Sequence, residues 1–291
     1  MGGSEPTRPG SNRITTILLI VAAIVLVFGL ATSNLIRPLS QRTDQLSIEI
    51  LQPNIDLDIS TFNGAIQIEP VDSEAMTMKI IMRGAEDDLE RTSIDSGNQD
   101  RQDTKLIWLH ASFQGPTLGS TPSVSLEVQA PRNKIYTIKL ETSNGRVTLS
   151  NLEGRELEIH ISNGELVLTS LRFDDAECET SNGRIEASIA SRNADFSTSN
   201  GEIELDVDGE GNYRATSSNG GVDVRIRIRT EVRVYASTSN ARVTWQGPTL
   251  IAGQSTQTLL VGQTERYGQT GANVDLRIQT SNGGISISAE S

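Results

Sequence analysis

The sequence predicts an all-β fold, a parallel β-solenoid of coils about 19 residues long, preceded by one N-terminal transmembrane helix. Three observations predict it: an uncharged apolar block near the N-terminus, a Ser-Asn-Gly phrase that recurs at nearly even spacing, and apolar residues that alternate with polar ones around each phrase. Only 36% of the residues are hydrophobic and 4% are aromatic. This composition favours a thin body filled by small and β-branched side chains over a thick globule.

Residues 14–36 carry no charged side chain and are the expected membrane segment. At about 1.5 Å per residue, a helix of this length crosses a hydrocarbon core of roughly 30 Å. We therefore expect a short tail at 1–13, a transmembrane signal anchor at 14–36 and a linker at 37–45. A cleaved signal peptide is the alternative, because Ala31-Thr32-Ser33 offers the small residues of a cleavage site.

Charge and cysteine content bear on the compartment. Residues 1–42 carry a net +3 and the remaining 249 residues a net −15. So acidic a body repels nucleic acid, and we expect no nucleic-acid partner. Cys178 is the single cysteine, so no intramolecular disulfide can form, and the chain has no Asn-x-Ser/Thr sequon. We expect a single-pass protein of a prokaryotic cell membrane, with its C-terminal domain outside the cytoplasm.

The repeated phrase places one asparagine in each expected coil. The asparagines lie at 63, 144, 163, 182, 200, 219, 240 and 282, with gaps of 81, 19, 19, 18, 19, 21 and 42 residues. A period near 19 suits a coil that holds two or three short strands. The gap of 42 corresponds to two coils, and the gap of 81 to about four, or to three and an insertion. We therefore expect a solenoid domain over residues 46–291.

Alignment on the asparagine sorts the residues into columns. The positions three and five after it, and four and six before it, are apolar and alternate with polar neighbours, which predicts two half-buried strands per coil. Before the asparagine the inward positions lie an even number of residues away from it, and after the glycine they lie an odd number away. The chain therefore needs a corner at Asn-Gly, where glycine supplies a positive φ or a cramped conformation. Stacked asparagine amides could bond to one another there. The alternative is that Asn-Gly forms hairpin turns in an antiparallel sandwich. The columns keep the same alignment across the copies of the phrase, which favours stacked coils over this alternative.

Between Asn63 and Asn144 strands are expected at 76–82, 106–111, 124–128 and 135–140. Two segments interrupt the repeat, one among these strands and one near the C-terminus. A polar insertion at 84–104 is expected to be an unpacked loop. An irregular segment at 246–273 replaces one corner. Because the open ends of a solenoid need caps, we expect these two segments to supply them.

The recurring Ser-Asn-Gly phrase, the preceding membrane segment and the strand Val124-Ser-Leu-Glu-Val-Gln-Ala-Pro131 resemble the prokaryotic putative-adhesin β-solenoid family. The resemblance covers about Leu46 to Ser291 and is strongest from Ile135 to Trp245. It implies a surface-exposed repeat domain. The family has no established catalytic residues to carry over to this chain.

Catalytic and metal-binding motifs are absent from the sequence. There is no His-Glu-x-x-His, Cys-x-x-Cys, phosphate loop or Gly-x-Ser-x-Gly. His160 falls at an outward position and is interpreted as a solvated side chain, and Cys178 falls in an inward column as a buried hydrophobe. We therefore expect no enzyme, no cofactor and no bound metal.

Charged side chains occupy the outward columns. The column two after the asparagine alternates in sign and is expected to fix the register of the coils; it holds Arg146, Glu165, Arg184 and Glu202. Two other columns stack like charges; they hold Glu158, Glu177 and Asp195, and Glu186, Glu204 and Asp223. These rows either bind Ca²⁺ weakly, meet a basic partner, or are neutralised by Arg184, Arg214 and Arg225. We favour the neutralisation.

A cluster of arginines is the one candidate binding patch. Alternation places Arg225, Arg227 and Arg229 on one face, with Arg233 and Arg242 nearby in the sequence. Such a patch would suit a polyanionic glycan or an acidic partner. The alternative is an ordinary strand with a charged solvent face.

Together these features predict a membrane-anchored, extracytoplasmic, non-enzymatic β-solenoid that presents a repeat surface for adhesion or cell-envelope scaffolding, with an envelope polymer or protein as its partner. A sensory or regulatory ectodomain acting on a membrane partner is the alternative. A third class, a polysaccharide-active enzyme, is kept open only by the acidic rows.

Overall fold

The computed structural model describes residues 39–116, 121–269 and 273–290. The chain divides into two units, Met1–Ser40 and Gln41–Ser291, and the fold below is that of the described residues of the second. The expected tail at 1–13 and membrane segment at 14–36 lie outside the described residues, and none of the helices within the described ranges is long and apolar enough to span a bilayer. The expected linker at 37–45 is wrong in part, since β1 (Leu39–Glu49) is a strand that pairs with β4 (Ala75–Ala85).

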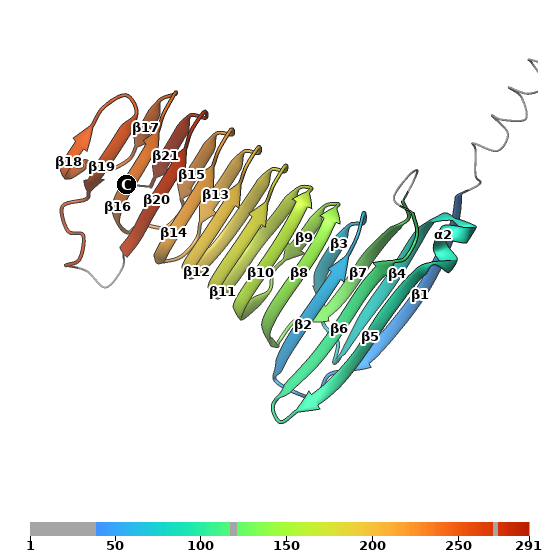
Figure 1. The fold of residues 1–291 in the computed structure, drawn as a ribbon. Coiled ribbons are helices and arrows are strands. Elements are labelled where there is room, and N and C mark those ends of the chain that lie inside the picture. Colours follow the sequence, from blue (N-terminus) through green and yellow to red (C-terminus); the bar gives the residue numbers. More distant parts are fainter. Residues whose placement is uncertain (1–38, 117–120, 270–272, 291) are drawn as a thin grey trace, which may run out of the picture. The chain divides into compact units, whose positions relative to one another are not determined.

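The repeats form two stacks of parallel strands that meet at the Asn-Gly corners (Figure 1). The first stack, in order of pairing, is β6 (Thr104–Phe113), β2 (Asn54–Thr61), β8 (Ile135–Asn144), β10 (Glu153–Asn163), the second halves of β11 (Leu166–Thr180) and β12 (Ile185–Thr198), β14 (Gly211–Ser217), β20 (Asn273–Thr280) and β16 (Glu231–Thr238). The predicted parallel solenoid is confirmed.

The second stack carries each coil onward from its corner. In order of pairing it is β7 (Ser123–Pro131), β3 (Ile66–Val71), β9 (Val147–Ser150), the first halves of β11 and β12, β13 (Ile203–Val207), β15 (Val222–Ile226), β21 (Ile285–Ala289) and β17 (Val243–Gln246). Each coil therefore contributes one strand to each stack.

The core lies between the two stacks and consists of the predicted inward columns. Across the first stack Leu140, Ile159, Cys178 and Phe196 are in register and almost wholly buried. Each such aliphatic or aromatic side chain contributes roughly 1.5–3 kcal/mol by its burial. Because equivalent positions stack directly, small and β-branched residues fill the space and few large rings are needed.

The corners bring the backbones of neighbouring coils unusually close. A Cβ on Gly183 would lie 1.6 Å from the carbonyl oxygen of Gly164, and one on Gly220 would lie 1.7 Å from that of Gly201. Within the described residues, none of the corner glycines has a positive φ. Glycine is therefore required by the cramped approach and not by a left-handed backbone.

Inward threonine and serine hydroxyls bond to these same corner carbonyls. Thr198 Oγ1 donates to the carbonyl oxygen of Gly183 at 3.1 Å, and Ser217 Oγ donates to that of Gly201 at 2.9 Å. The position two before the asparagine is therefore threonine or serine at most corners, Ile161 being an exception, because the hydroxyl satisfies a buried acceptor.

The expected asparagine ladder is present along the corners. Asn163 Nδ2 donates to Asn144 Oδ1 at 2.9 Å, and the same bond joins Asn182 to Asn163 at 2.7 Å and Asn200 to Asn182 at 2.6 Å. Further bonds join Asn144 to Asn63, Asn219 to Asn200, Asn282 to Asn219 and Asn240 to Asn282. Each interior amide thus donates to one coil and accepts from the next.

The coils do not stack in the order of the sequence at the C-terminal end. The last coil, β20 and β21, lies between the coil of β14 and β15 and the coil of β16 and β17 (Figure 1). The expectation that the 42-residue gap corresponds to two coils is wrong, because residues 251–263 within it pair as antiparallel strands and add no coil. After the coil of β16 and β17 the chain continues through 246–273, and its final coil, β20 and β21, then packs between that coil and the coil of β14 and β15.

The N-terminal end repeats this arrangement. The coil of β2 and β3 lies between that of β6 and β7 and that of β8 and β9, although β2 and β3 come first in the sequence (Figure 1). The 81-residue gap therefore holds one stacked coil and a set of antiparallel strands, not three or four coils.

Antiparallel strands cap both ends, in the segments where caps were expected. At the N-terminal end β5 (Thr92–Arg101) pairs with β6 and β4 pairs with β7, and α2 (Glu86–Glu90) joins them. The expectation of an unpacked loop at 84–104 is therefore wrong. At the C-terminal end β19 (Leu259–Gln263) pairs with β16, and β18 (Ile251–Ser255) pairs with β19. Caps of this kind cover the open edges of the parallel stacks.

Candidate functional site

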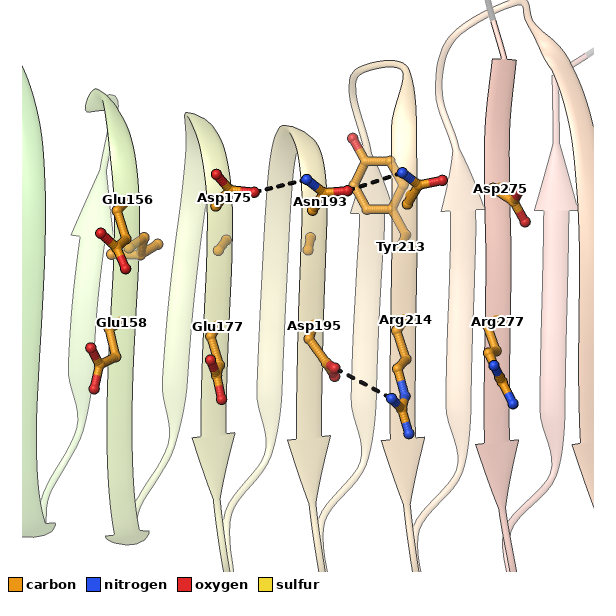
Figure 2. A pocket seen from close by; sticks show the side chains of 14 residues that line it. Glu156, Glu158, Asp175, Glu177, Asn193, Asp195, Tyr213, Arg214, Asp275 and Arg277 are labelled. Carbon is orange, nitrogen blue, oxygen red and sulfur yellow. Dashed lines mark hydrogen bonds and ion pairs between the residues drawn. The ribbon is translucent and has the colours of Figure 1, made fainter.

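The outward face of the first stack carries an ordered row of charges, here named the central row. In stacking order it holds Asp58, Lys139, Glu158, Glu177, Asp195, Arg214, Arg277 and Tyr235. Three acidic residues on β10, β11 and β12 are followed by two arginines on β14 and β20 (Figure 2). Along the stacking direction the charge of the row therefore changes from negative on β10, β11 and β12 to positive on β14 and β20.

The ends of the acidic run are neutralised within the chain, and its centre is not. Lys139 Nζ lies 2.9 Å from Glu158, and Arg214 lies 3.8 Å from Asp195. Glu177 is exposed and makes no hydrogen bond or ion pair with any described residue. The Arg277 guanidinium is exposed and lies 5.8 Å from the centre of the Tyr235 ring.

The two ends also differ in their acidity. The hydrogen bond from Lys139 lowers the pKa of Glu158. Partial burial raises the pKa of Asp195, and the Arg214 charge only partly opposes this rise. The carboxylates at the two ends of the acidic run therefore differ, because Glu158 accepts a close hydrogen bond from Lys139 and Asp195 is desolvated.

A second row runs beside the central row, two residues earlier on each strand. It holds Glu156, Asp175, Asn193, Asn212, Asp275 and Arg233. Asn193 Nδ2 donates to Asp175 at 2.8 Å, and Asn212 Nδ2 donates to Asn193 Oδ1 at 3.0 Å (Figure 2). Asp275 is ion-paired with Arg233 and accepts a hydrogen bond from the Tyr267 hydroxyl at 3.0 Å.

The two rows line a shallow groove of about 500 Å³ that extends from Glu156 to Arg277. Ala176 and Ala194 lie between the rows along their strands but are buried on the inward side, so strand backbone forms the floor of the groove. Acid–amide–arginine surfaces of this kind can bind a polar or charged partner. Among the described residues no three His, Cys, Asp or Glu side chains converge on a metal-sized site. Spacing of about 4.8 Å between coils spreads the carboxylates along the row.

The other acidic column lies on the second stack, and arginines pair with two of its three carboxylates. Arg184 lies 2.6 Å from Glu204, and Arg225 lies 3.6 Å from Asp223. The alternating column two after the asparagine forms the pair between Arg146 and Glu165, but Arg184 reaches Glu204 instead of Glu165 or Glu202. Neutralisation by arginine thus accounts for Glu204, Asp223 and Asp195, whereas Glu186 makes no ion pair with a described residue.

The structure brings together only part of the predicted arginine patch. Arg225 and Arg227 both pair with Asp206, and Arg229 lies beyond the end of β15. Arg233 belongs to the first stack, where it pairs with Asp275. Arg242 lies at a corner, in a separate hollow beside Glu202 and Glu204. The acidic partners come from neighbouring coils, which alternation along one strand could not reveal.

His160 and Cys178 occupy the expected positions. His160 is half-buried on the outward face, with Nε2 3.0 Å from Glu158 and Nδ1 3.6 Å from Glu179. Cys178 is buried in the core, and burial raises the pKa of its thiol, which disfavours the thiolate.

The sequence did not reveal that Asp275, Arg277 and Tyr235 share a face with the acidic run. Their columns were aligned correctly, but sequence order placed Tyr235 beside Arg214 and Arg277 two coils further on. In the structure Arg277 lies directly between them. The missing information was the order of the coils.

The described residues define a parallel β-solenoid with a charged outward groove. The model of the Toastrack DUF4097 family matches residues 41–288, and the chain belongs to this family of unknown function. The resemblance expected from the repeated phrase is thereby confirmed. A comparison with curated proteins gave no match.

Several solved structures are similar over most of their length. A "putative cell adhesion protein" from Clostridium sporogenes has 10% identity and a TM-score of 0.44, covering 86% of this chain and 100% of its own. A "putative adhesin" from Bacteroides fragilis has 11% identity and a TM-score of 0.37, covering 85% and 97%. A "putative lipid binding protein" from Parabacteroides distasonis has 13% identity and a TM-score of 0.38, covering 86% and 96%.

Proposed function

We propose that the protein is a membrane-anchored, extracytoplasmic and non-catalytic β-solenoid that presents its repeat surface for adhesion or envelope scaffolding. One observation carries the proposal: the outward face of the first stack arranges its polar side chains in rows, with one residue per coil and one open groove. The uncharged segment at 14–36 supports the anchor.

The construction of the face supports recognition. Coils about 4.8 Å apart give each row a fixed repeat, and the asparagine ladder and shared core hold that repeat rigid. A rigid face binds a partner with little loss of conformational entropy. Binding of this kind needs complementary shape and charge and no reacting group.

Affinity capture from the native envelope tests the proposal. The full chain, extracted in mild detergent, should retain an envelope polymer or protein. A variant carrying Glu156→Gln and Glu177→Gln should lose most of it, whereas the matched control Glu202→Gln on the second stack should not. Equal capture by all three chains would contradict a role for this face. Release of reducing sugar from a glycan panel by the purified chain would contradict the absence of catalysis.

A further inference from the structure

The order of charges along the central row is self-complementary. Three acids lie on one side of a point between β12 and β14, and two arginines and a tyrosine lie on the other. We propose that this face binds a second copy of the same chain, about a two-fold axis that runs parallel to the strands between β12 and β14. The inference goes beyond the proposed function and does not depend on it.

The symmetry fixes which strands face each other. An axis at this place reverses the stacking order and keeps the position along each strand. It sets β12 over the partner's β14, β11 over the partner's β20 and β10 over the partner's β16. The two stacks then run in opposite directions.

The central row becomes a series of opposite charges in this register. Asp195 faces the partner's Arg214, and Glu177 faces the partner's Arg277. Each contact occurs twice because the interface is isologous. Glu177 and Arg277 are exposed and have no ion pair with any described residue of their own chain, so the second copy supplies the counter-charge that each lacks.

The second row fits the same register at most of its positions. Glu156 faces the partner's Arg233, and Asn193 faces the partner's Asn212, whose amides can bond in either direction. One like-charged contact results, between Asp175 and the partner's Asp275. Within the chain both carboxylates are already engaged, Asp175 by Asn193 and Asp275 by Arg233 and Tyr267.

The size of the face indicates a weak and salt-sensitive pair. Six strands about 4.8 Å apart, each with three outward positions, cover roughly 600 Å² on each copy, or about 1,200 Å² in total. That area lies at the lower limit of specific interfaces. Exposed charge pairs contribute mostly register and encounter rate, so added salt should weaken the pair.

Charge reversal at one matched pair provides the test. Sedimentation of the full chain in detergent at low salt should show a reversible dimer. Glu177→Arg alone and Arg277→Glu alone should each weaken it by about tenfold or more, since each brings like charges together across the axis. A mixture of the two variants should restore the dimer, because every reversed residue then faces an opposite charge.

The control is Glu202→Arg, an exposed acid on the second stack, which should leave the dimer unchanged. Thermal melts of each variant separate weak pairing from failure to fold. A wild-type chain that stays monomeric at all concentrations would overturn the proposal, and so would a mixture no better than its components. Either result would leave envelope capture, the test of the proposed function, unaffected.

Discussion

The central coils and the end coils of this solenoid use the same corner but differ in how they are ordered. From Asn144 to Asn219 the coils stack in the order in which they are synthesised, joined by parallel strands only. At each end one coil is inserted behind its neighbour, and the outermost coil carries antiparallel strands.

The difference shows that the repeat specifies stacking but not sequence order. Most corners offer an amide that donates and accepts, a glycine that permits close approach, and an inward hydroxyl; Ala241 and Ile161 are exceptions. Any coil can therefore stack on any other. The connecting segments decide which neighbours meet, and they also provide the caps that a strictly sequential repeat would lack.

The largest contrast is expected between a core side chain of the centre and one of a cap. Phe196→Ala should cost about 3–5 kcal/mol in the free energy of unfolding, because the ring is wholly buried between coils that cannot collapse into the cavity. Leu260→Ala in the C-terminal cap should cost about 2 kcal/mol and mainly loosen β18 and β19. Denaturant unfolding and amide exchange measure the two effects, and equal losses would contradict the distinction.

Two adjacent glycines at one corner, Gly220 and Gly221, should respond differently to substitution by alanine. Gly220→Ala should destabilise the fold by about 3 kcal/mol, because its Cβ would lie 1.7 Å from the carbonyl oxygen of Gly201. Gly221→Ala should be nearly neutral, since its nearest neighbour would be 3.4 Å away. Denaturation midpoints compare the two. If both were tolerated, glycine at the corner would not be there for close approach.

A smaller contrast separates the interior of the asparagine ladder from its end. Asn182→Ala removes a donor and an acceptor and should cost about 1 kcal/mol, moderated by exposure to water. Asn240→Ala removes only the donated bond to Asn282 and should cost a few tenths of that. Thermal unfolding would show this order, and a larger loss at Asn240 would contradict it.

The smallest effects concern pH and distinguish two acids of the central row. The lowered pKa of Glu158 means that its stabilisation is present above the pKa of an unfolded glutamate and is lost as pH falls through the native value. Lys139→Met should therefore flatten the acid limb of a stability profile. The raised pKa of Asp195 has the opposite sign, so Asp195→Asn should lose less stability than wild type as pH rises through the carboxyl range. Parallel profiles for all three chains would contradict both assignments.

The sequence was sufficient for the coil and insufficient for the order of the coils. Alternation around each asparagine gave the buried columns, including the inward Thr198 and Ser217, because every coil has the same local environment. The strand at Thr92–Arg101 was missed because an edge strand needs few apolar residues. Gly97 in this strand is paired with Trp108, and the Trp108 ring occupies the space that a side chain at position 97 would need.

The charged face could be predicted only in part for the same reason. The stacking of Glu158, Glu177 and Asp195 follows from sequential coils and was predicted correctly. The proximity of Arg277 to Arg214 depends on the inserted coil. The ion pairs of the predicted arginine patch could not be foreseen, because Asp206 and Asp275 reach its members from neighbouring strands.

Two engineered disulfides can show whether the last coil is inserted between two earlier ones. In the structure Gln279 is in register with Thr216 on one side and Ser237 on the other. The double variant Thr216→Cys with Gln279→Cys should form a disulfide on mild oxidation, because neighbouring parallel strands lie within the reach of about 4.4–6.8 Å between Cα atoms. Thr216→Cys with Ser237→Cys should form none within one chain. The reverse result, a disulfide from 216 to 237 and none from 216 to 279, would show that the coils stack in sequence order.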